Sequence, residues 1–70
     1  MTIGDNIKTA RAKRDMTQLL LAHKIGMSGE DAGAFISRIE AGIQEPRIGT
    51  LRKIAEALKV TVNFLLTGKK

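Results

Sequence analysis

The chain lacks cysteine, tryptophan and tyrosine, and its 70 residues include only one proline, one histidine and two phenylalanines. Without cysteine it can form no disulfide, which fits a reducing compartment such as the cytoplasm. The longest apolar run, residues 19–22, has four residues, whereas a membrane-spanning helix needs about 20. The first residues also lack the basic start and apolar stretch of a signal peptide. We therefore expect a cytoplasmic protein that has no membrane segment.

Catalytic and metal-binding patterns are also missing. The single histidine, His23, has no cysteine or carboxylate cluster nearby with which to form a metal site or a nucleophilic triad. The seven glycines are scattered and form no phosphate-binding loop. We therefore expect no enzyme activity, no catalytic residue, no metal and no cofactor, and we interpret His23 as a surface residue.

Basic residues outnumber acidic ones, which gives a net charge of +5. Such a balance in a small protein indicates a polyanionic partner. Five Lys or Arg residues oppose two acids in residues 1–28, and seven oppose three in residues 36–70. Between these parts, the only charged residues are Glu30 and Asp31. The chain is therefore basic on both sides of one short acidic segment.

Two helices are predicted in the first part of the chain. Thr2 and Asp5 have the spacing of a capping box, and apolar residues then recur at helical intervals as far as residue 14. Thr17 predicts the cap of a second helix over about residues 18–25, and Gly26 ends it in a left-handed turn.

Two further helices follow. Ile36 and Ile39 mark the inner face of a third helix, which ends at Gly42. Thr50 predicts the cap of a fourth helix over residues 51–58, where apolar residues at i, i+3, i+4 and i+7 form a stripe that faces the core.

Thr61 opens a short fifth helix that ends at Gly68. Five short helices with brief connections predict an all-α fold, a compact five-helix bundle. We find no repeat, low-complexity segment or second domain, so we expect a single domain over residues 1–70.

The order of these motifs resembles the phage repressor and Cro-like helix-turn-helix family, also called the Xre family, from residue 3 to residue 68. The matching motifs are Arg11, TQ at 17–18, LA at 21–22, Gly26, ISRIEAG at 36–42, Pro46 and LRKIAEAL at 51–58. The resemblance implies a lambda repressor-like fold in which the recognition helix lies in the major groove. It also implies a transcriptional regulator, a repressor that binds a near-palindromic operator in double-stranded DNA as a homodimer.

The chain departs from the family before the recognition helix, because seven residues separate Ser28 from Ile36 where the family usually has three. If Ser28 is the N-cap, with Asp31 in the capping-box position, the recognition helix spans about residues 29–41 and gains about one turn. If the extra residues form a loop instead, the helix begins near residue 32 or 33. The apolar phase favours the extended helix, although two glycines weaken it by about 1 kcal/mol each.

Three side chains on the outward face of this helix are candidates for contacts to bases. Arg38 is the strongest candidate, because a guanidinium can donate two parallel hydrogen bonds to guanine N7 and O6. Ser37 can bond to a base or a phosphate, and Ala34 offers only a methyl group to thymine. A phosphate contact or solvated charge is the plainer role for Arg38.

Other contacts follow from the resemblance. It implies that the amide of Gln18, beside the cap residue Thr17, contacts a phosphate. It also implies that Arg47 lies near the DNA backbone or the minor groove. Arg14 adds attraction to phosphate. The family also pairs the residues that match Arg11 and Glu40, an ion pair that fixes geometry rather than reading bases.

Several apolar residues are unexpected on the surface of a monomer. The family resemblance implies a two-fold dimer contact through the last helix, so we expect Val62 and Phe64 to form it. Such a contact would set two recognition helices about 34 Å apart. Phe64 could instead complete the small core. Leu19 and Leu20, on the side of the second helix that normally faces solvent, could bind another protein.

Two alternatives therefore stay open beside specific regulation. One is an antitoxin-type or other protein-interaction module that neutralises a partner protein. The other is non-specific nucleic-acid binding, if the acidic insertion has abolished base readout; equal affinity for all duplexes with a steep salt dependence would reveal it.

Overall fold

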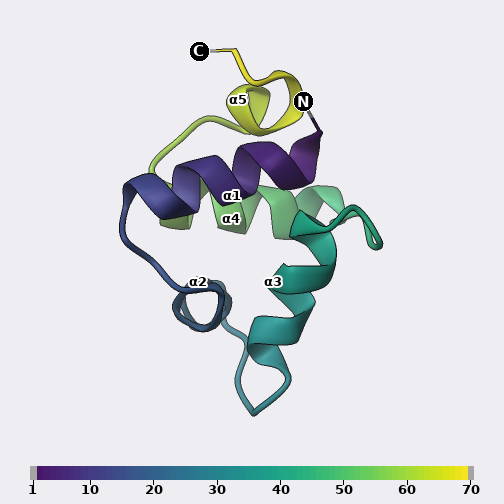
Figure 1. Cartoon of the computed structure of the whole chain (residues 1–70). Helices are drawn as coiled ribbons and strands as arrows, with labels where there is room; N and C mark the ends of the chain where they lie inside the picture. Colours follow the sequence, from purple (N-terminus) through teal and green to yellow (C-terminus); the bar gives the residue numbers. More distant parts are fainter. Residues whose placement is uncertain (1, 70) are drawn as a thin grey trace.

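A computed structural model describes residues 2–69, which form five helices joined by short connections (Figure 1). The helices are α1 (Ile3–Lys13), α2 (Gln18–Lys24), α3 (Ala32–Glu40), α4 (Ile48–Leu58) and α5 (Val62–Thr67). The predicted all-α five-helix fold is therefore confirmed. The domain was expected over residues 1–70, of which residues 1 and 70 lie outside the described part. None of the helices within residues 2–69 has the length and apolar character to cross a membrane.

Three of the predicted caps are present. Thr2 and Asp5 form the reciprocal capping box of α1, in which the Asp5 backbone N–H donates to Thr2 Oγ1 over 3.1 Å. Thr17 accepts a hydrogen bond of 3.0 Å from the Leu20 N–H, and Thr61 one of 2.9 Å from the Phe64 N–H. Each of these side chains satisfies a backbone donor that the first turn of a helix leaves free.

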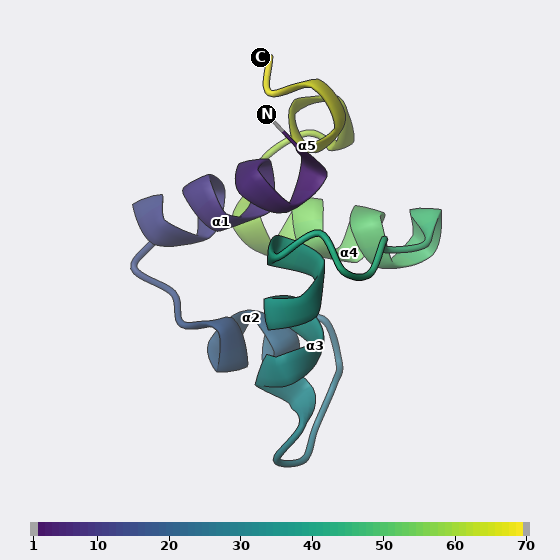
Figure 2. The same ribbon diagram turned by 45° about the vertical axis from the view of Figure 1, so that its right-hand side comes forward.

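The favoured prediction, a recognition helix that begins near residue 29, is wrong, and the alternative, a loop with the helix beginning near residue 32 or 33, is confirmed. The α3 helix begins at Ala32 rather than at residue 29, Ser28 does not cap it, and Asp31 occupies the N-cap position without a side-chain hydrogen bond. Gly29 has a φ of +95°, a conformation that interrupts a helix. The four extra residues therefore lengthen the connection, which lies at the end of the molecule farthest from α5 (Figures 1 and 2).

The predicted cap of α4 is also wrong. This helix begins at Ile48, two residues before Thr50, and its N-cap residue is Arg47. Arg47 follows Pro46, and its extended backbone, with φ −71° and ψ 160°, lets its carbonyl accept a hydrogen bond of 2.8 Å from the Leu51 N–H. Backbone geometry after the proline thus sets the start of α4 without a capping side chain.

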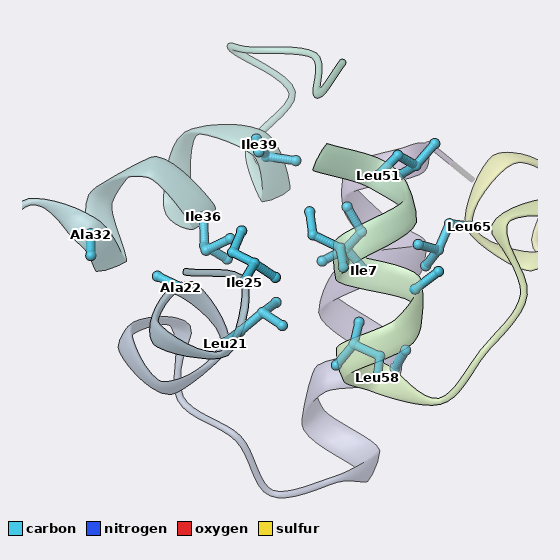
Figure 3. Close-up of a cluster of buried hydrophobic side chains, with 13 residues drawn as sticks. Ile7, Leu21, Ala22, Ile25, Ala32, Ile36, Ile39, Leu51, Leu58 and Leu65 are labelled. Carbon is cyan, nitrogen blue, oxygen red and sulfur yellow. The ribbon is translucent and has the colours of Figure 1, made fainter. Parts of the chain in front are cut away.

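The core lies between the pair α2 and α3 on one side and α1, α4 and α5 on the other (Figure 3). All five helices contribute apolar side chains that pack in the interior. The buried apolar residues are Ile7, Ala10, Leu21, Ala22, Ile25, Ala32, Ile36, Ile39, Leu51, Ile54, Ala55, Leu58 and Leu65. The burial of Ala32, Ile36 and Ile39 turns the opposite face of α3 outward.

Two residues near the start of α1 connect it closely to its neighbours. A Cβ atom built on Gly4 would lie 2.5 Å from the Ile39 carbonyl oxygen and 2.6 Å from that of Glu40, so α1 and the end of α3 meet at a distance that only glycine permits. Asn6 is completely buried, and its Nδ2 donates a hydrogen bond of 3.0 Å to the Leu65 carbonyl in α5. The first turn of α1 therefore positions both α3 and α5.

Candidate nucleic-acid interface

The helices α2 and α3 pack directly against each other. A Cβ built on Gly33, in the first turn of α3, would lie 3.5 Å from the Cα of Leu19 in the first turn of α2. Both views show the two helices side by side below α1 and α4 (Figures 1 and 2). This is the arrangement that a helix-turn-helix unit needs to place one helix on the DNA backbone and the next in the groove.

The three residues predicted to contact bases, Ala34, Ser37 and Arg38, are all exposed on the outer side of α3. Among them only Arg38 has a long, charged side chain. Its Nε donates a hydrogen bond of 3.1 Å to the side-chain oxygen Oε1 of Gln44, in the connection that follows α3. The surface thus presents a guanidinium beside a hydroxyl and a methyl group.

Arg11 and Glu40 lie together as a partly buried ion pair. Arg11 Nε lies 2.7 Å from Glu40 Oε2, and Arg11 Nη2 donates to Glu40 Oε1 over 3.1 Å. Arg11 Nη1 also donates to the Met16 carbonyl over 2.6 Å, so the guanidinium joins α1, α3 and the connection between α1 and α2. The hydrogen bond to Glu40 raises the pKa of Arg11 above its ordinary value, whereas burial acts in the opposite direction.

Gln18 takes part in the same network. Its amide Nε2 donates a hydrogen bond of 3.1 Å to Glu40 Oε1, the oxygen that also accepts from Arg11. A side-chain amide carries two N–H groups, so one remains to donate to a phosphate. Glu40 thereby holds the side-chain amide of Gln18, in α2, against the carboxyl end of α3.

The other residues predicted to contact phosphate occupy cap positions of three different helices. Thr17 is exposed and caps α2, and Arg47 is exposed at the start of α4. The guanidinium Nε of Arg14 donates a hydrogen bond of 2.7 Å to the Leu58 carbonyl. Arg14 therefore has a structural contact at the end of α4, which the sequence did not suggest, and its contact to phosphate stays a prediction.

The apolar residues singled out in the sequence differ in exposure. Val62 and Phe64 are half-buried and pack against the core, and Phe64 also lines a surface hollow of about 750 Å³ with Met16 and Val60. Leu19 and Leu20 are 45% and 43% exposed. Sequence reasoning overlooked three other exposed apolar side chains, which are Ile43, Ile48 and Leu66.

Sequence reasoning also missed Gly4, Asn6 and Gln44. The glycine in the first turn of a predicted helix was a usable signal, because glycine disfavours a helix unless a close approach requires it. The polar Asn6 one position before the buried Ile7 gave no such signal. Within residues 2–69, no group of three or more His, Cys, Asp or Glu residues could hold a metal ion.

The family model for the helix-turn-helix domain matches residues 33–65. Among curated proteins, the immunity repressor protein of Bacillus phage phi105 is 33% identical over 66 residues, which are 94% of this chain and 43% of the repressor. An uncharacterized HTH-type transcriptional regulator of Bacillus subtilis (strain 168), YqaE, is 32% identical over 66 residues, which are 94% of this chain and 53% of that protein.

The chain thus spans about half the length of these curated relatives. Among solved structures, the P22 c2 repressor protein in complex with a synthetic operator matches with a TM-score of 0.86 and 28% identity, over 99% of this chain and 98% of the repressor chain. The lambda repressor-like fold predicted from the sequence is therefore confirmed.

Proposed function

Because this chain forms a helix-turn-helix domain of the Xre type, similar to phage repressors, we propose that it is a non-enzymatic transcriptional regulator that represses by binding specific sites in double-stranded DNA. One observation carries the proposal: almost the whole chain superposes on a repressor whose structure was solved on an operator. The net charge of +5 supports it, since such a surface attracts phosphate. We also propose that it carries out this function in the cytoplasm, as the absence of cysteine led us to expect.

In this proposal α3 lies in the major groove and Arg38 reads a guanine, while Ser37 and Ala34 complete the contact surface. Exposure of the three side chains on one face of a helix supports this assignment. A bidentate contact from an arginine to guanine discriminates against other bases by about 1–3 kcal/mol. Most of the sequence preference should therefore come from one base pair in each half-site.

Phosphate contacts from the neighbouring elements would fix the register of α3. We assign them to Thr17 and Gln18 at the start of α2 and to Arg47 at the start of α4, with Arg14 adding attraction. The Gln18 amide is suited to this role because its bond to Glu40 already restricts its orientation. Such contacts strengthen binding to every sequence equally.

We further propose that the protein binds as a homodimer through α5. Half-buried Val62 and Phe64, together with Leu66, which is 47% exposed, supply apolar side chains from one short helix. A two-fold pair would place two α3 helices about 34 Å apart, one helical turn of DNA, and would require a near-palindromic operator.

Selection of binding sites from a random duplex library, at near-physiological salt, tests the proposal. We expect enrichment of an inverted repeat, because non-specific affinity is weak under these conditions. Arg38→Ala should relax the preference at one base pair per half-site, whereas Gln18→Ala should weaken binding to all sequences similarly. If the folded protein enriches no sequence, specific regulation is ruled out and non-specific binding or a protein partner takes its place.

A second candidate function rests on the exposure of Leu19 and Leu20. Adjacent leucines that are nearly half exposed form a surface to which another protein could bind, as in an antitoxin that neutralises a toxin. Co-purification of a partner in fixed stoichiometry, lost when both leucines are replaced by serine, would favour this function. A pull-down without such a partner would count against it.

A further inference from the structure

Gln44 is hydrogen-bonded to Arg38, the residue proposed to read a guanine. It is half-buried in the connection between α3 and α4, whereas Arg38 is exposed. Its Oε1 accepts a hydrogen bond of 3.1 Å from Arg38 Nε. The contact joins two side chains on the surface that the proposed function turns toward DNA.

Backbone hydrogen bonds hold Gln44 beside Arg38 independently of the Gln44 side chain. Gly42 adopts a φ of +79°, which turns the chain back at the end of α3. The backbone N–H groups of Ile43 and Gln44 then both donate to the Arg38 carbonyl, over 3.0 and 3.3 Å. Gln44 is therefore bonded to Arg38 through its main chain and through its side chain, so the two residues move together.

The choice of the Arg38 nitrogen matters chemically. A guanidinium carries five N–H donors, one on Nε and four on the terminal nitrogens. The bond to Gln44 uses Nε, which leaves both terminal nitrogens available. These two nitrogens form the planar fork that can donate in parallel to guanine N7 and O6. The bond to Gln44 therefore leaves all four terminal N–H groups of Arg38 free.

We propose that Gln44 is a positioning residue for sequence recognition, which holds the Arg38 guanidinium so that its terminal nitrogens face the base edge. Gln44 itself contacts no base in this arrangement. It contributes to discrimination by restricting a flexible side chain before DNA arrives, since an ordered side chain loses less freedom on binding. The inference rests on the proposed function, because it assumes that Arg38 reads a base.

The test uses the site obtained by selection, together with duplexes that differ from it at single base pairs. Dissociation constants are measured for the parent, Gln44→Ala, Gln44→Glu, Arg38→Ala and the double variant Gln44→Ala with Arg38→Ala. Circular dichroism melting checks that each variant is folded. We expect Gln44→Ala to reduce discrimination about fivefold at the base pair read by Arg38, the size of one lost hydrogen bond, and to leave discrimination at other positions unchanged.

Two comparisons separate positioning from a merely structural role. Gln44→Ala should have no further effect once Arg38 is alanine, because interacting residues are not additive. Gln44→Glu keeps an oxygen that accepts from Nε, so it should retain discrimination at that base pair, while its charge weakens binding to all sequences alike.

The outcomes distinguish this inference from the proposed function. If the parent prefers a sequence and Gln44→Ala weakens all duplexes equally, Gln44 acts on the DNA backbone and the inference is overturned while the function stands. An equal effect of Gln44→Ala with and without Arg38 also overturns it. If the folded parent prefers no sequence, the proposed function fails and the inference fails with it.

Discussion

At the carboxyl end of α3, Glu40 is buried and accepts hydrogen bonds from Arg11 and Gln18, whereas at the amino end Asp31 makes no side-chain hydrogen bond to the helix. The difference extends to the backbone. The carboxyl end approaches α1 so closely that a Cβ on Gly4 would lie 2.5 Å from a carbonyl oxygen, while a Cβ on Gly33 at the amino end would meet α2 at an ordinary 3.5 Å.

This contrast explains how the chain accommodates its four extra residues. They enter the exposed connection before the amino end of α3, whose N-cap residue makes no side-chain hydrogen bond, and leave the buried contacts of the carboxyl end in place. Arg38 lies two residues from Glu40, in the firmly held half, whereas Ala34 lies in the first turn. The proposed readout thus depends on the part of α3 that the insertion does not disturb. Four experiments test this comparison.

The largest effect is expected at the ion pair. Arg11→Met leaves the Glu40 carboxylate, whose side chain is only 4% exposed, without its charged partner. Removing one member of a buried pair costs about 3 kcal/mol of unfolding free energy. Urea unfolding followed by circular dichroism measures it. The double variant Arg11→Met with Glu40→Met should be no less stable than Arg11→Met alone, and additive losses would show that the pair does not act as a unit.

Gly4→Ala should follow, with a loss of about 2 kcal/mol, because the added methyl group overpacks a backbone contact. Gly49→Ala is the matched control: it also lies in the first turn of a helix, but its Cβ would meet nothing within 4 Å. The same unfolding experiment should find Gly49→Ala as stable as the parent or more so. Equal stability of the two variants would mean that the carboxyl end of α3 is not tightly held.

A smaller effect separates two N-cap residues. Thr17→Ala removes a capping hydrogen bond of 3.0 Å and should cost about 1 kcal/mol. Asp31→Ala removes no such bond at the start of α3 and should change stability by less than about 0.5 kcal/mol. Thermal melting of the two variants compares them directly. A large loss for Asp31→Ala would show that the amino end of α3 depends on this carboxylate.

The smallest effect has the opposite sign. Gly33 occupies the same position in α3 as Gly4 in α1, the second residue of the helix. Because its Cβ would make only ordinary contact with Leu19, Gly33→Ala should stabilise the fold by about 0.5 kcal/mol through the reduced freedom of the unfolded chain. Urea unfolding should show a higher midpoint. A lower midpoint would mean that α2 and α3 pack as tightly as α1 and α3.

Much of the fold could be predicted from local signals. Thr2, Thr17 and Thr61 cap helices as expected, since a hydroxyl three residues before a free N–H acts within one turn. Thr50 has the same chemistry but lies inside α4, because the extended backbone after Pro46 starts the helix two residues earlier. The start of α3 was misjudged because the apolar phase favoured the extended helix, whereas the φ of +95° at Gly29 interrupts it.

The ion pair of Arg11 and Glu40 could be predicted from the family resemblance, whereas the other side-chain contacts between distant residues could not. Arg38 could be placed on an outer face from helical periodicity alone. Its bond to Gln44 depends on a turn that returns the chain across six positions, and the bond between Arg14 and Leu58 joins residues 44 positions apart. Helical periodicity describes one helix at a time, so it cannot predict contacts between residues that are far apart in the sequence.

The hydrogen bond from Asn6 to the Leu65 carbonyl has a consequence for symmetry. Apolar contacts alone would let α5 rotate or slide on α1, because they have little directional preference. A buried amide bonded to one carbonyl fixes the rotational phase of α5 instead. In a dimer formed through α5, that phase sets the direction of the two-fold axis, and with it the number of base pairs between the two half-sites that the protein can occupy.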